Sequence, residues 1–299
     1  MLLRKIERKK LLGISKQKKE RWQELLWRKD GEFYLAAEKK YAALLHKKEI
    51  NFESRIFGLK RFHIDIALES DESDDFETLL NEIHKILPDN GHISIRIPAG
   101  IASMIIEFQK KGWFFADQSV EYSFEHSPEV FPAQFTISSP RTDEIKILSD
   151  LTGKLLSDSR FIRTRFTTDP MLLPQAHLFY KEWAERTLRR CKDGIALVAR
   201  NHLNKPLGMI TAHIERMCGF TIGRIELNAV IPEYRSQGVY SYMLAEMLKK
   251  LFEKGAKEVV IRTSASTISV QRVWNRFGGS PTKSDVIFHR HPFRKKVYE

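Results

Sequence analysis

The stretch VIPEYRSQGVYSYML, Val230 to Leu244, connects a strand-like run to a helix-like one. The run IELNAV that leads into it is apolar, the loop is polar and contains Gly238, and the apolar residues that follow recur with helical spacing. The first turn of a helix has backbone N–H groups without partners inside the helix, and glycine lets an anion approach them. This junction therefore predicts either a phosphate-binding loop or a plain strand-to-helix connection in an α/β domain.

Length and composition place the chain among soluble globular proteins. It has 299 residues, of which 42% are hydrophobic and 29% charged, enough for one large or two ordinary domains. The two cysteines, Cys191 and Cys218, cannot by themselves form a disulfide framework or a zinc site, so no metal is expected. The start of the sequence lacks the apolar core of a signal peptide, and no apolar run is long enough to span a membrane. We expect a cytoplasmic location.

The positive charge is concentrated at the N-terminus. Residues 1–50 contain fifteen Lys or Arg and seven Asp or Glu, so they carry eight of the chain's twelve net positive charges. The pattern of Leu and Trp among these basic residues predicts a basic helical extension, which Gly13 divides. Such a helix either packs on its own domain through Trp22 and Trp27, or lies peripherally on the inner face of a membrane or on a partner. No nucleic-acid-binding motif is present, so no nucleic acid is expected as a partner.

Two globular parts follow the extension. Residues 51–140 predict an N-terminal α/β domain, with strands at 63–68, 93–97 and 116–125 and helices at 76–87 and 101–111. The Pro- and Ser-rich stretch PEVFPAQFTISSPRTDE interrupts this pattern. Residues 141–299 begin with two helices, continue with three strands joined by tight turns, and end with strand–helix–strand crossovers. The fold class predicted from this order is α/β with a mixed sheet.

The order of elements and the run AVIPEYRSQGVYSYML resemble the acetyl-CoA-binding motif of the GNAT N-acetyltransferase superfamily. That motif has a Gln or Arg, two residues, a glycine, one residue, and then Gly or Ala. Arg235 and Gly238 match it, and Tyr240 departs from it. The resemblance implies acetyl-CoA as the acyl donor and a GNAT domain at residues 141–299.

Other segments are similar to a narrower group, the dTDP-fucosamine acetyltransferases, which act on sugar nucleotides in bacterial surface-polysaccharide synthesis. TRFTTDP, followed by the Tyr-x-x-Trp helix of Tyr180 and Trp183, matches that group, as does FESRIFG from Phe52 to Gly58. The likeness covers about residues 51–292. It implies an acceptor that carries an amine on a nucleotide-linked sugar.

The resemblance also implies where acetyl-CoA binds. The pantetheine would pair with the strand that ends at Val230, and the pyrophosphate would lie on the loop and first helical turn, where Tyr240 is tolerable if its side chain points outward. The residues implied are Leu227, Ala229, Val230, Arg235, Ser236, Gln237, Gly238, Val239, Tyr240, Ser241 and Thr267. An amine would attack the thioester directly, and a strand amide near Asn228 would stabilise the oxyanion.

The acid of this family does not carry over. Many GNAT enzymes have a tyrosine in the helix before the last strand, and Trp274 in WNRFGG occupies that place. An indole donates a hydrogen bond but is not an acid at neutral pH, so Trp274 is also interpreted as a core anchor. Three alternatives remain: the thiolate leaves without an acid, a neighbour such as Ser269 or Tyr240 serves, or the protein does not acetylate.

Candidate groups for the base and the acceptor are less specific. Glu226 is the carboxylate nearest the predicted site, but it also fits a strand carboxylate paired with a Lys or Arg, and the base position of histone-type relatives is Arg224. Arg165, with Phe166 beside it, suits the diphosphate of a sugar nucleotide or an ion pair with Asp169. His213 is a further candidate for acceptor contact. The functional alternatives are a catalytically weak or inactive GNAT-fold binding protein, and an acyltransferase for a protein or peptide amine.

Overall fold

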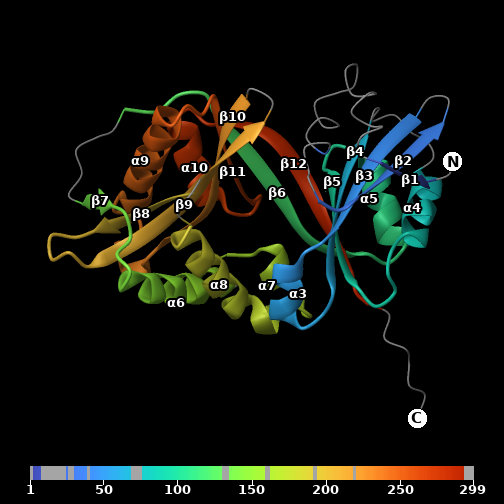
Figure 1. Cartoon of the computed structure of the whole chain (residues 1–299), viewed down its shortest axis with the longest axis horizontal. Coiled ribbons are helices and arrows are strands. Elements are labelled where there is room, and N and C mark those ends of the chain that lie inside the picture. Colours follow the sequence, from blue (N-terminus) through green and yellow to red (C-terminus); the bar gives the residue numbers. More distant parts are fainter. Residues whose placement is uncertain are drawn as a thin grey trace, which may run out of the picture. The chain divides into compact units, whose positions relative to one another are not determined.

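The computed structural model describes residues 3–7, 25, 30–38, 41–68, 76–129, 135–158, 162–190, 194–217 and 220–292. The chain divides into two compact units (Figure 1): unit 1 comprises Met1–Gln118 and Asp285–Glu299, and unit 2 comprises Ser119–Ser284. The predicted division at residues 140/141 differs from this one. The chain passes from one unit to the other within two strands, β6 (Phe114–Phe124) and β12 (Ser280–Arg290), whose apolar patterns give no local sign of a boundary.

Unit 1 is a mixed sheet with two covering helices. Its strand order is β1-β2-β3-β4-β5, followed by the Asp285–Arg290 part of β12. Strands β4 and β5 are parallel, because the crossover helix α4 joins them. The elements are β1 (Leu3–Ile6), β2 (Glu32–Glu38), β3 (Tyr41–Glu49), α3 (Asn51–Phe57), β4 (Arg61–Leu68), α4 (Phe76–Lys85), β5 (His92–Pro98) and α5 (Ala102–Lys110).

The predicted helical extension at residues 1–50 is wrong where the structure describes it. Leu3–Ile6 is a strand, and Glu32–Glu38 and Tyr41–Glu49 are antiparallel strands, of which the second pairs with β4. Both faces of this strand pair are buried, since Phe33 and Leu44 pack on one side and Tyr34 and Leu45 on the other. Its Ala- and Leu-rich sequence favours a helix locally, but pairing in the sheet overrides that preference. The predicted anchors Trp22 and Trp27 lie outside the described residues.

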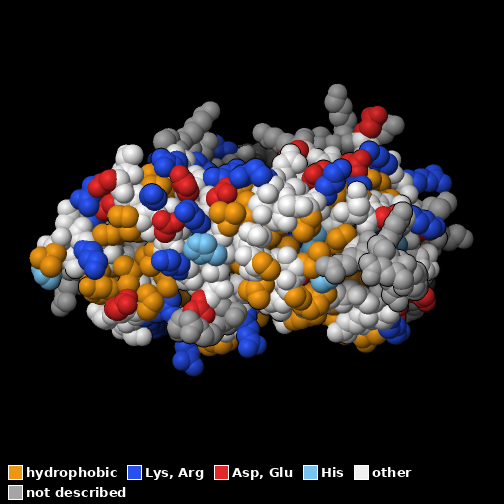
Figure 2. Space-filling model, turned by 90° about the horizontal axis from the view of Figure 1, so that it is seen from below, with side chains coloured by type: hydrophobic (Ala, Val, Ile, Leu, Met, Phe, Trp, Pro, Cys, Tyr) orange, Lys and Arg blue, Asp and Glu red, His pale blue; other side chains and the backbone are white. Residues whose placement is uncertain are grey.

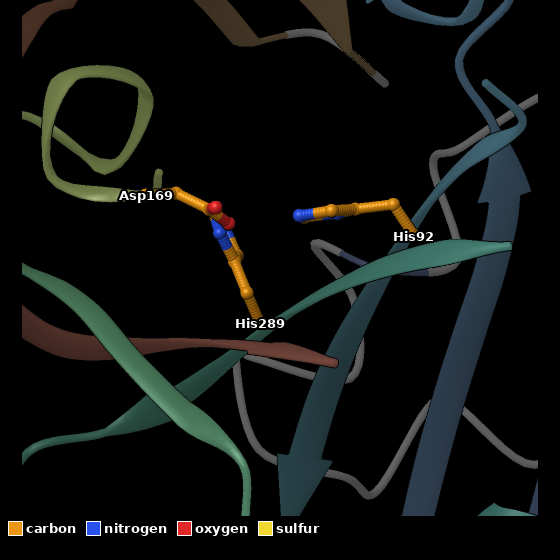
Figure 3. Close-up of side chains that lie close together, drawn as sticks. All are labelled: His92, Asp169 and His289. Carbon is orange, nitrogen blue, oxygen red and sulfur yellow. The ribbon is translucent and has the colours of Figure 1, made fainter. Parts of the chain in front are cut away.

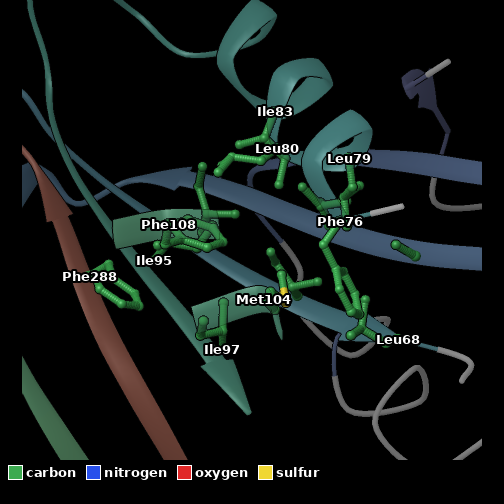
Figure 4. Close-up of a cluster of buried hydrophobic side chains, with 14 of the residues drawn as sticks. Leu68, Phe76, Leu79, Leu80, Ile83, Ile95, Ile97, Met104, Phe108 and Phe288 are labelled. Carbon is green, nitrogen blue, oxygen red and sulfur yellow. The ribbon is translucent and has the colours of Figure 1, made fainter. Parts of the chain in front are cut away.

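The core of unit 1 lies between its sheet and the helices α4 and α5 (Figure 4). Phe76, Leu79, Leu80 and Ile83 recur at the spacing that puts them on one face of α4, and all are buried. Each such side chain contributes roughly 1.5–3 kcal/mol when it is fully buried. They pack with side chains from α5 and the sheet, including Met104, Phe108, Ile95, Ile97 and Phe288.

A polar cluster is also buried in unit 1. The fully buried guanidinium of Arg61 donates from Nε to Glu53 Oε2 at 2.8 Å and from Nη1 to His92 Nδ1 at 3.0 Å. Because arginine only donates, His92 accepts at Nδ1 and carries its proton on Nε2. The ring of His92 meets that of His289 edge-on, with centroids 4.6 Å apart (Figure 3). Asp169, also drawn in Figure 3, belongs to unit 2 and is described there.

Unit 2 is a second mixed sheet, with the strand order β7-β8-β9-β10-β11 followed by the Ser119–Phe124 part of β6. Strands β10 and β11 are parallel, with α9 as their crossover. In sequence order the elements are β7 (Thr136–Ser138), α6 (Glu144–Ser157), α7 (Arg165–Thr168), η2 (Leu173–Gln175), α8 (Ala176–Leu188), β8 (Gly194–Arg200), β9 (Pro206–Met217), β10 (Phe220–Val230), η3 (Pro232–Tyr234), α9 (Val239–Glu253), β11 (Glu258–Ser264) and α10 (Ile268–Arg276).

Helices cover both faces of the unit 2 sheet. Figure 1 shows α9 and α10 on one side, with α6 and α8 on the other. The buried residues of α9, among them Met243, Met247 and Leu251, join Ile225 and Ile261 of the sheet in one apolar cluster. The predicted mixed α/β fold is confirmed, and the strands and helices predicted for residues 141–299 are all present.

Two of the segments that resemble sugar-nucleotide acetyltransferases, TRFTTDP and the Tyr-x-x-Trp helix, pack together in unit 2. Thr164 caps α7, and its hydroxyl lies 2.7 Å from that of Tyr180. Phe166 contacts the ring of Phe179 at a centroid distance of 4.1 Å. The buried carboxylate of Asp169 accepts from the backbone N–H of Met171 at 2.8 Å. Much of this motif therefore shapes the loop before α8.

Charged side chains of both signs cover the surface between apolar patches. On the face drawn in Figure 2, Lys and Arg side chains are interspersed with Asp and Glu. Within the part of the chain that the structure describes, no helix is both long and apolar enough to cross a membrane.

Candidate functional site

The parallel strands β10 and β11 diverge at one end. Their pairing runs from Ile222↔Glu258 to Ile225↔Ile261, although β10 continues to Val230 and β11 to Ser264. At the same point β10 has a bulge, since its register with β9 shifts between Ile225 and Leu227. Glu226 therefore lies at the bulge. A bulge and an end of pairing together aim a strand away from its neighbour, which opens a V-shaped splay beyond Ile225 and Ile261.

The loop after this splay turns sharply into α9. Ser236 and Gly238 both have left-handed backbone conformations, with φ of 60° and 82°, and Gly238 is the N-cap of the 15-residue helix. A Cβ on Gly238 would meet no atom within 4 Å, so a side chain at this position would project into open space. The Gln237 amide donates to Glu233 O at 2.8 Å and holds the loop. This geometry suits a phosphate at the helix N-terminus.

The remaining predicted cofactor residues surround the splay and the loop. The last residues of β10 still pair with β9, but their pairing with β11 has ended. Their backbone groups on the β11 side therefore line the splay. These residues are Leu227, Asn228, Ala229 and Val230. Arg235 reaches back, its Nε 3.4 Å from Val230 O. Val239 is buried in the core, Ser241 lies in the first turn of α9, and Thr267 precedes α10.

Tyr240 does not meet the condition of an outward side chain. Its ring packs against the core of unit 2, and its hydroxyl accepts a hydrogen bond of 2.7 Å from Trp274 Nε1. Burial raises the pKa of the Tyr240 hydroxyl above its usual range, so it stays protonated. Trp274 is buried and its ring meets that of Tyr122, as expected for a core anchor.

Glu226 is an ion-paired carboxylate. Its Oε2 lies 2.5 Å from Arg190 Nη1, just beyond α8, and 3.1 Å from His213 Nδ1 on β9. The other ring nitrogen of His213 lies 3.0 Å from Glu215 Oε1, so the imidazole bridges two carboxylates. The interpretation of Glu226 as a paired strand carboxylate is thus supported, with Arg190 and His213 as its partners.

These contacts fix the charges of the group. Burial lowers the pKa of His213, but hydrogen bonds to Glu215 and Glu226 outweigh it and raise the pKa to about 9. The hydrogen bond from His213 lowers the pKa of Glu215 to about 2. Burial raises the pKa of Glu226, but His213 and Arg190 lower it below its usual value. At neutral pH the imidazolium and both carboxylates are charged, which makes Glu226 a weak base.

The network extends across the sheet. Arg224 on β10 donates to Glu215 at 3.3 Å and lies 3.6 Å from Glu121 on β6. Arg262 on β11 donates to Glu121 from Nη2 at 3.0 Å and from Nε at 3.3 Å. Glu121 is buried, yet these cations hold its pKa below the usual value against the effect of burial.

Sequence reasoning proposed Glu226 and His213, and the structure brings them together. It missed Arg190, Glu215, Glu121 and Arg262. A signal was present, because charged residues alternate with apolar ones on strands otherwise buried, as in His213/Glu215 and Arg224/Glu226. Which distant strands pair with one another could not be predicted from the sequence. Arg165 and Phe166 lie on α7 instead, where the guanidinium stacks 4.3 Å from the Phe166 ring centroid.

Comparison with known families gives a match to part of unit 2. Residues 161–278, which include the splay, the loop and α9, match the family model described as the acetyltransferase (GNAT) family. The match and the fold indicate an acyltransferase domain of the GNAT type in this segment. Domains of this family bind acetyl-CoA and an acceptor, in agreement with the open helix N-terminus.

Solved structures share the fold at low sequence identity. A GCN5-related N-acetyltransferase from Sphaerobacter thermophilus has a TM-score of 0.54 at 13% identity, covering 91% of this chain and 86% of that one. A fungal GH3 β-N-acetylglucosaminidase with a GCN5-related glucosamine N-acetyltransferase region has a TM-score of 0.57 at 12% identity, over 97% of this chain and 38% of that one. A tandem GNAT protein of clavulanic acid biosynthesis has a TM-score of 0.50 at 9% identity, over 89% of this chain and 84% of that one. A search of curated proteins found no match.

Proposed function

We propose that the chain is an acetyl-CoA-dependent N-acetyltransferase whose acceptor is the amine of a nucleotide-linked amino sugar. The observation that carries the donor is the splay beyond Ile225 and Ile261, followed by the open N-terminus of α9 at Gly238. Two features support the acceptor. One is the TRFTTDP loop with its Tyr-x-x-Trp helix, and the other is the fold shared with the glucosamine N-acetyltransferase region of the fungal protein.

Acetyl-CoA supplies a thioester, and this chain supplies the groups around it. The free edge of Leu227 to Val230 offers backbone N–H and C=O groups to an extended pantetheine, as a neighbouring strand would. The N–H groups of the first turn of α9 face the pyrophosphate. A strand N–H near Asn228 stabilises the oxyanion, an effect worth roughly 3 kcal/mol for one donor in other enzymes.

Proton handling follows from the charges at the site. Glu226 is held by Arg190 and His213, so its role is to attract and orient the acceptor amine rather than to take a proton in full. The amine attacks in its neutral form. Tyr240 keeps its proton and offers a hydrogen bond to the departing thiolate, while Trp274 orients the hydroxyl from the other side. Tyr240 would thus take the role of the tyrosine that many GNAT enzymes have at the position of Trp274.

The test is acetyl transfer by the full chain, followed as release of free thiol from acetyl-CoA. The acceptor panel comprises nucleotide-linked amino sugars, free glucosamine and a peptide amine, and Gly238→Glu gives the background rate. We expect turnover with nucleotide-linked amino sugars at least tenfold above the other amines. Turnover with the peptide alone would favour a protein or peptide acceptor, and no turnover with any amine would contradict the proposal.

A further inference from the structure

Three cationic side chains of unit 2 converge on one buried carboxylate. Glu121 on β6 has a side chain only 5% exposed. Its Oε2 lies 3.0 Å from Arg262 Nη2 and 3.6 Å from Arg224 Nη1, and its Oε1 lies 3.7 Å from Lys283 Nζ. A buried ion held by strands on both sides cannot move, so Glu121 fixes the positions of three cations that come from three other strands.

These cations share one face of the sheet. Arg224 lies opposite His213, and Arg262 lies opposite Glu121, so all four side chains project to the same side. Ile225 and Ile261, which point the other way, belong to the apolar cluster under α9. Arg262 is the first residue of β11 beyond its last pair with β10. The cationic group therefore borders the splay on the face opposite to α9.

The group keeps access to solvent. The side chains of Arg224, Arg262 and Lys283 are 32%, 25% and 29% exposed, while the carboxylate beneath them is not. Within the whole network, five cationic groups share three carboxylates: Arg190, His213, Arg224, Arg262 and Lys283 against Glu121, Glu215 and Glu226. Fixed cations at a half-buried surface attract anions more strongly than mobile ones in water, because less ordering is needed on binding.

We propose that Arg224, Arg262 and Lys283 form a subsite for the phosphate or diphosphate group of the acceptor. This inference rests on the proposed function and refines it, since it names how the acceptor is recognised. Guanidinium groups bind phosphate oxygens in pairs, and the ammonium of Lys283 adds a point charge. The subsite differs from the earlier expectation of Arg165, which lies on α7 and stacks on Phe166. It places the acceptor's charge beside Arg262 and its amine toward Glu226.

The test uses uridine diphosphate and inorganic pyrophosphate as probes on the full chain, by calorimetry in saturating coenzyme A. Filling the donor site first keeps the probes away from the N-terminus of α9. Arg224→Gln and Lys283→Gln should each weaken binding about tenfold, and Arg224→Lys should lose less. Lys205→Gln, an exposed lysine in the turn between β8 and β9, is the matched control and should leave binding unchanged. Binding should also weaken as salt rises.

Arg262 needs a paired substitution, because removing it alone leaves the buried Glu121 with less compensation. Glu121→Gln together with Arg262→Gln keeps the shape and removes both charges, and it should lower affinity without changing the binding of acetyl-CoA. The subsite would be overturned if Arg224→Gln, Lys283→Gln and the double variant all bound the probes as the wild type does. It would also be overturned if only Arg165→Gln lost binding. Acetyl transfer that persists alongside such a result would leave the proposed function standing. Probe binding lost as expected, with no amine acetylated, would contradict the function instead.

Discussion

His213 shows how one residue can link charge, stability and pH. Its imidazolium bridges Glu215 and Glu226, and its pKa is raised from about 6.5 to about 9. A raised pKa means that the folded state binds the proton more tightly than the unfolded chain does. The stability this provides is complete below the unfolded pKa and is lost as pH rises through the folded one.

We therefore expect the free energy of unfolding to fall between pH 6.5 and pH 9.5 by about 2 kcal/mol more in the wild type than in His213→Gln. Urea unfolding at the two pH values measures both proteins, and the difference between them removes the titration of other groups. An equal fall in the two proteins would show that the His213 ion pairs are not formed in solution.

The Tyr240–Trp274 hydrogen bond gives a second prediction at this scale. Tyr240→Phe removes the hydroxyl and keeps the ring, so it should lower kcat about 10-fold to 100-fold and leave acetyl-CoA affinity unchanged. Trp274→Phe keeps an aromatic anchor but loses the donor. It should retain most activity, at a cost in stability of about 1 kcal/mol from the lost hydrogen bond.

Steady-state kinetics and calorimetry on both variants provide the check. A folded Tyr240→Phe protein with the wild-type kcat would show that the hydroxyl takes no part in catalysis and serves packing alone. Trp274→Tyr places a second hydroxyl near the first, and an increase in kcat would indicate that departure of the thiol limits the rate.

Among the elements, α9 is the one on which the proposed donor binding depends. Gly238 at its N-terminus and Gly255 just past its C-terminus both have positive φ, and a Cβ on either meets open space. Glutamate at Gly238 puts a side chain and a negative charge where the pyrophosphate is expected. Acetyl-CoA affinity should fall at least tenfold in Gly238→Glu.

Gly255→Glu is a matched control, since it adds the same charge and similar backbone strain at the other end of the helix. Calorimetry should give wild-type affinity for this variant. Equal affinities for both variants would move the donor site away from the junction.

Because the strand pair β2–β3 belongs to the sheet of unit 1, membrane binding by the basic N-terminus is better tested by substitution than by truncation. Truncation of residues 1–45 would remove β1, β2 and part of β3 from the sheet of unit 1. Replacing Lys9, Lys10, Lys16, Lys18 and Lys19 by Gln removes charge and keeps the strands. If the segment contacts an anionic membrane, sedimentation with phosphatidylserine vesicles at low salt should fall clearly, since each basic residue contributes about 1 kcal/mol. Equal sedimentation of both proteins would remove the membrane from the list of partners.

At the scale of the whole molecule, the two units repeat one arrangement. In each, three antiparallel strands lead to a parallel pair joined by a helix: β2-β3-β4-α4-β5 in unit 1 and β8-β9-β10-α9-β11 in unit 2. The loop chemistry differs. Residues 69–75, between β4 and α4, include five Asp or Glu, whereas the loop before α9 has Arg235 and Gly238.

An acidic loop repels a pyrophosphate, so we expect one acetyl-CoA per chain, bound in unit 2. Calorimetry should give a stoichiometry near one that Gly238→Glu abolishes. A second equivalent of acetyl-CoA, retained by Gly238→Glu, would assign a donor site to unit 1.

From the sequence alone, the fold class was predicted correctly and a candidate donor loop was proposed. Strand and helix periods of residues 63–125 and 144–291 predicted the elements, and the glycine at a strand-to-helix junction pointed to the open N-terminus of α9. These signals are local, since hydrophobic period and backbone freedom act within a few residues. Local signals failed at residues 32–49, where pairing with β4 outweighed the helical preference of Ala and Leu.

Which charged side chains contact one another depends on the tertiary structure. Glu121 lies 141 residues from Arg262 in sequence and Arg190 lies 36 from Glu226, yet both pairs form hydrogen bonds on one sheet face. The tertiary structure also turned Tyr240 inward onto Trp274, a contact that the sequence did not indicate. Side-chain chemistry lists the candidates, but strand order and register choose the partners, and those are set by packing of the whole unit.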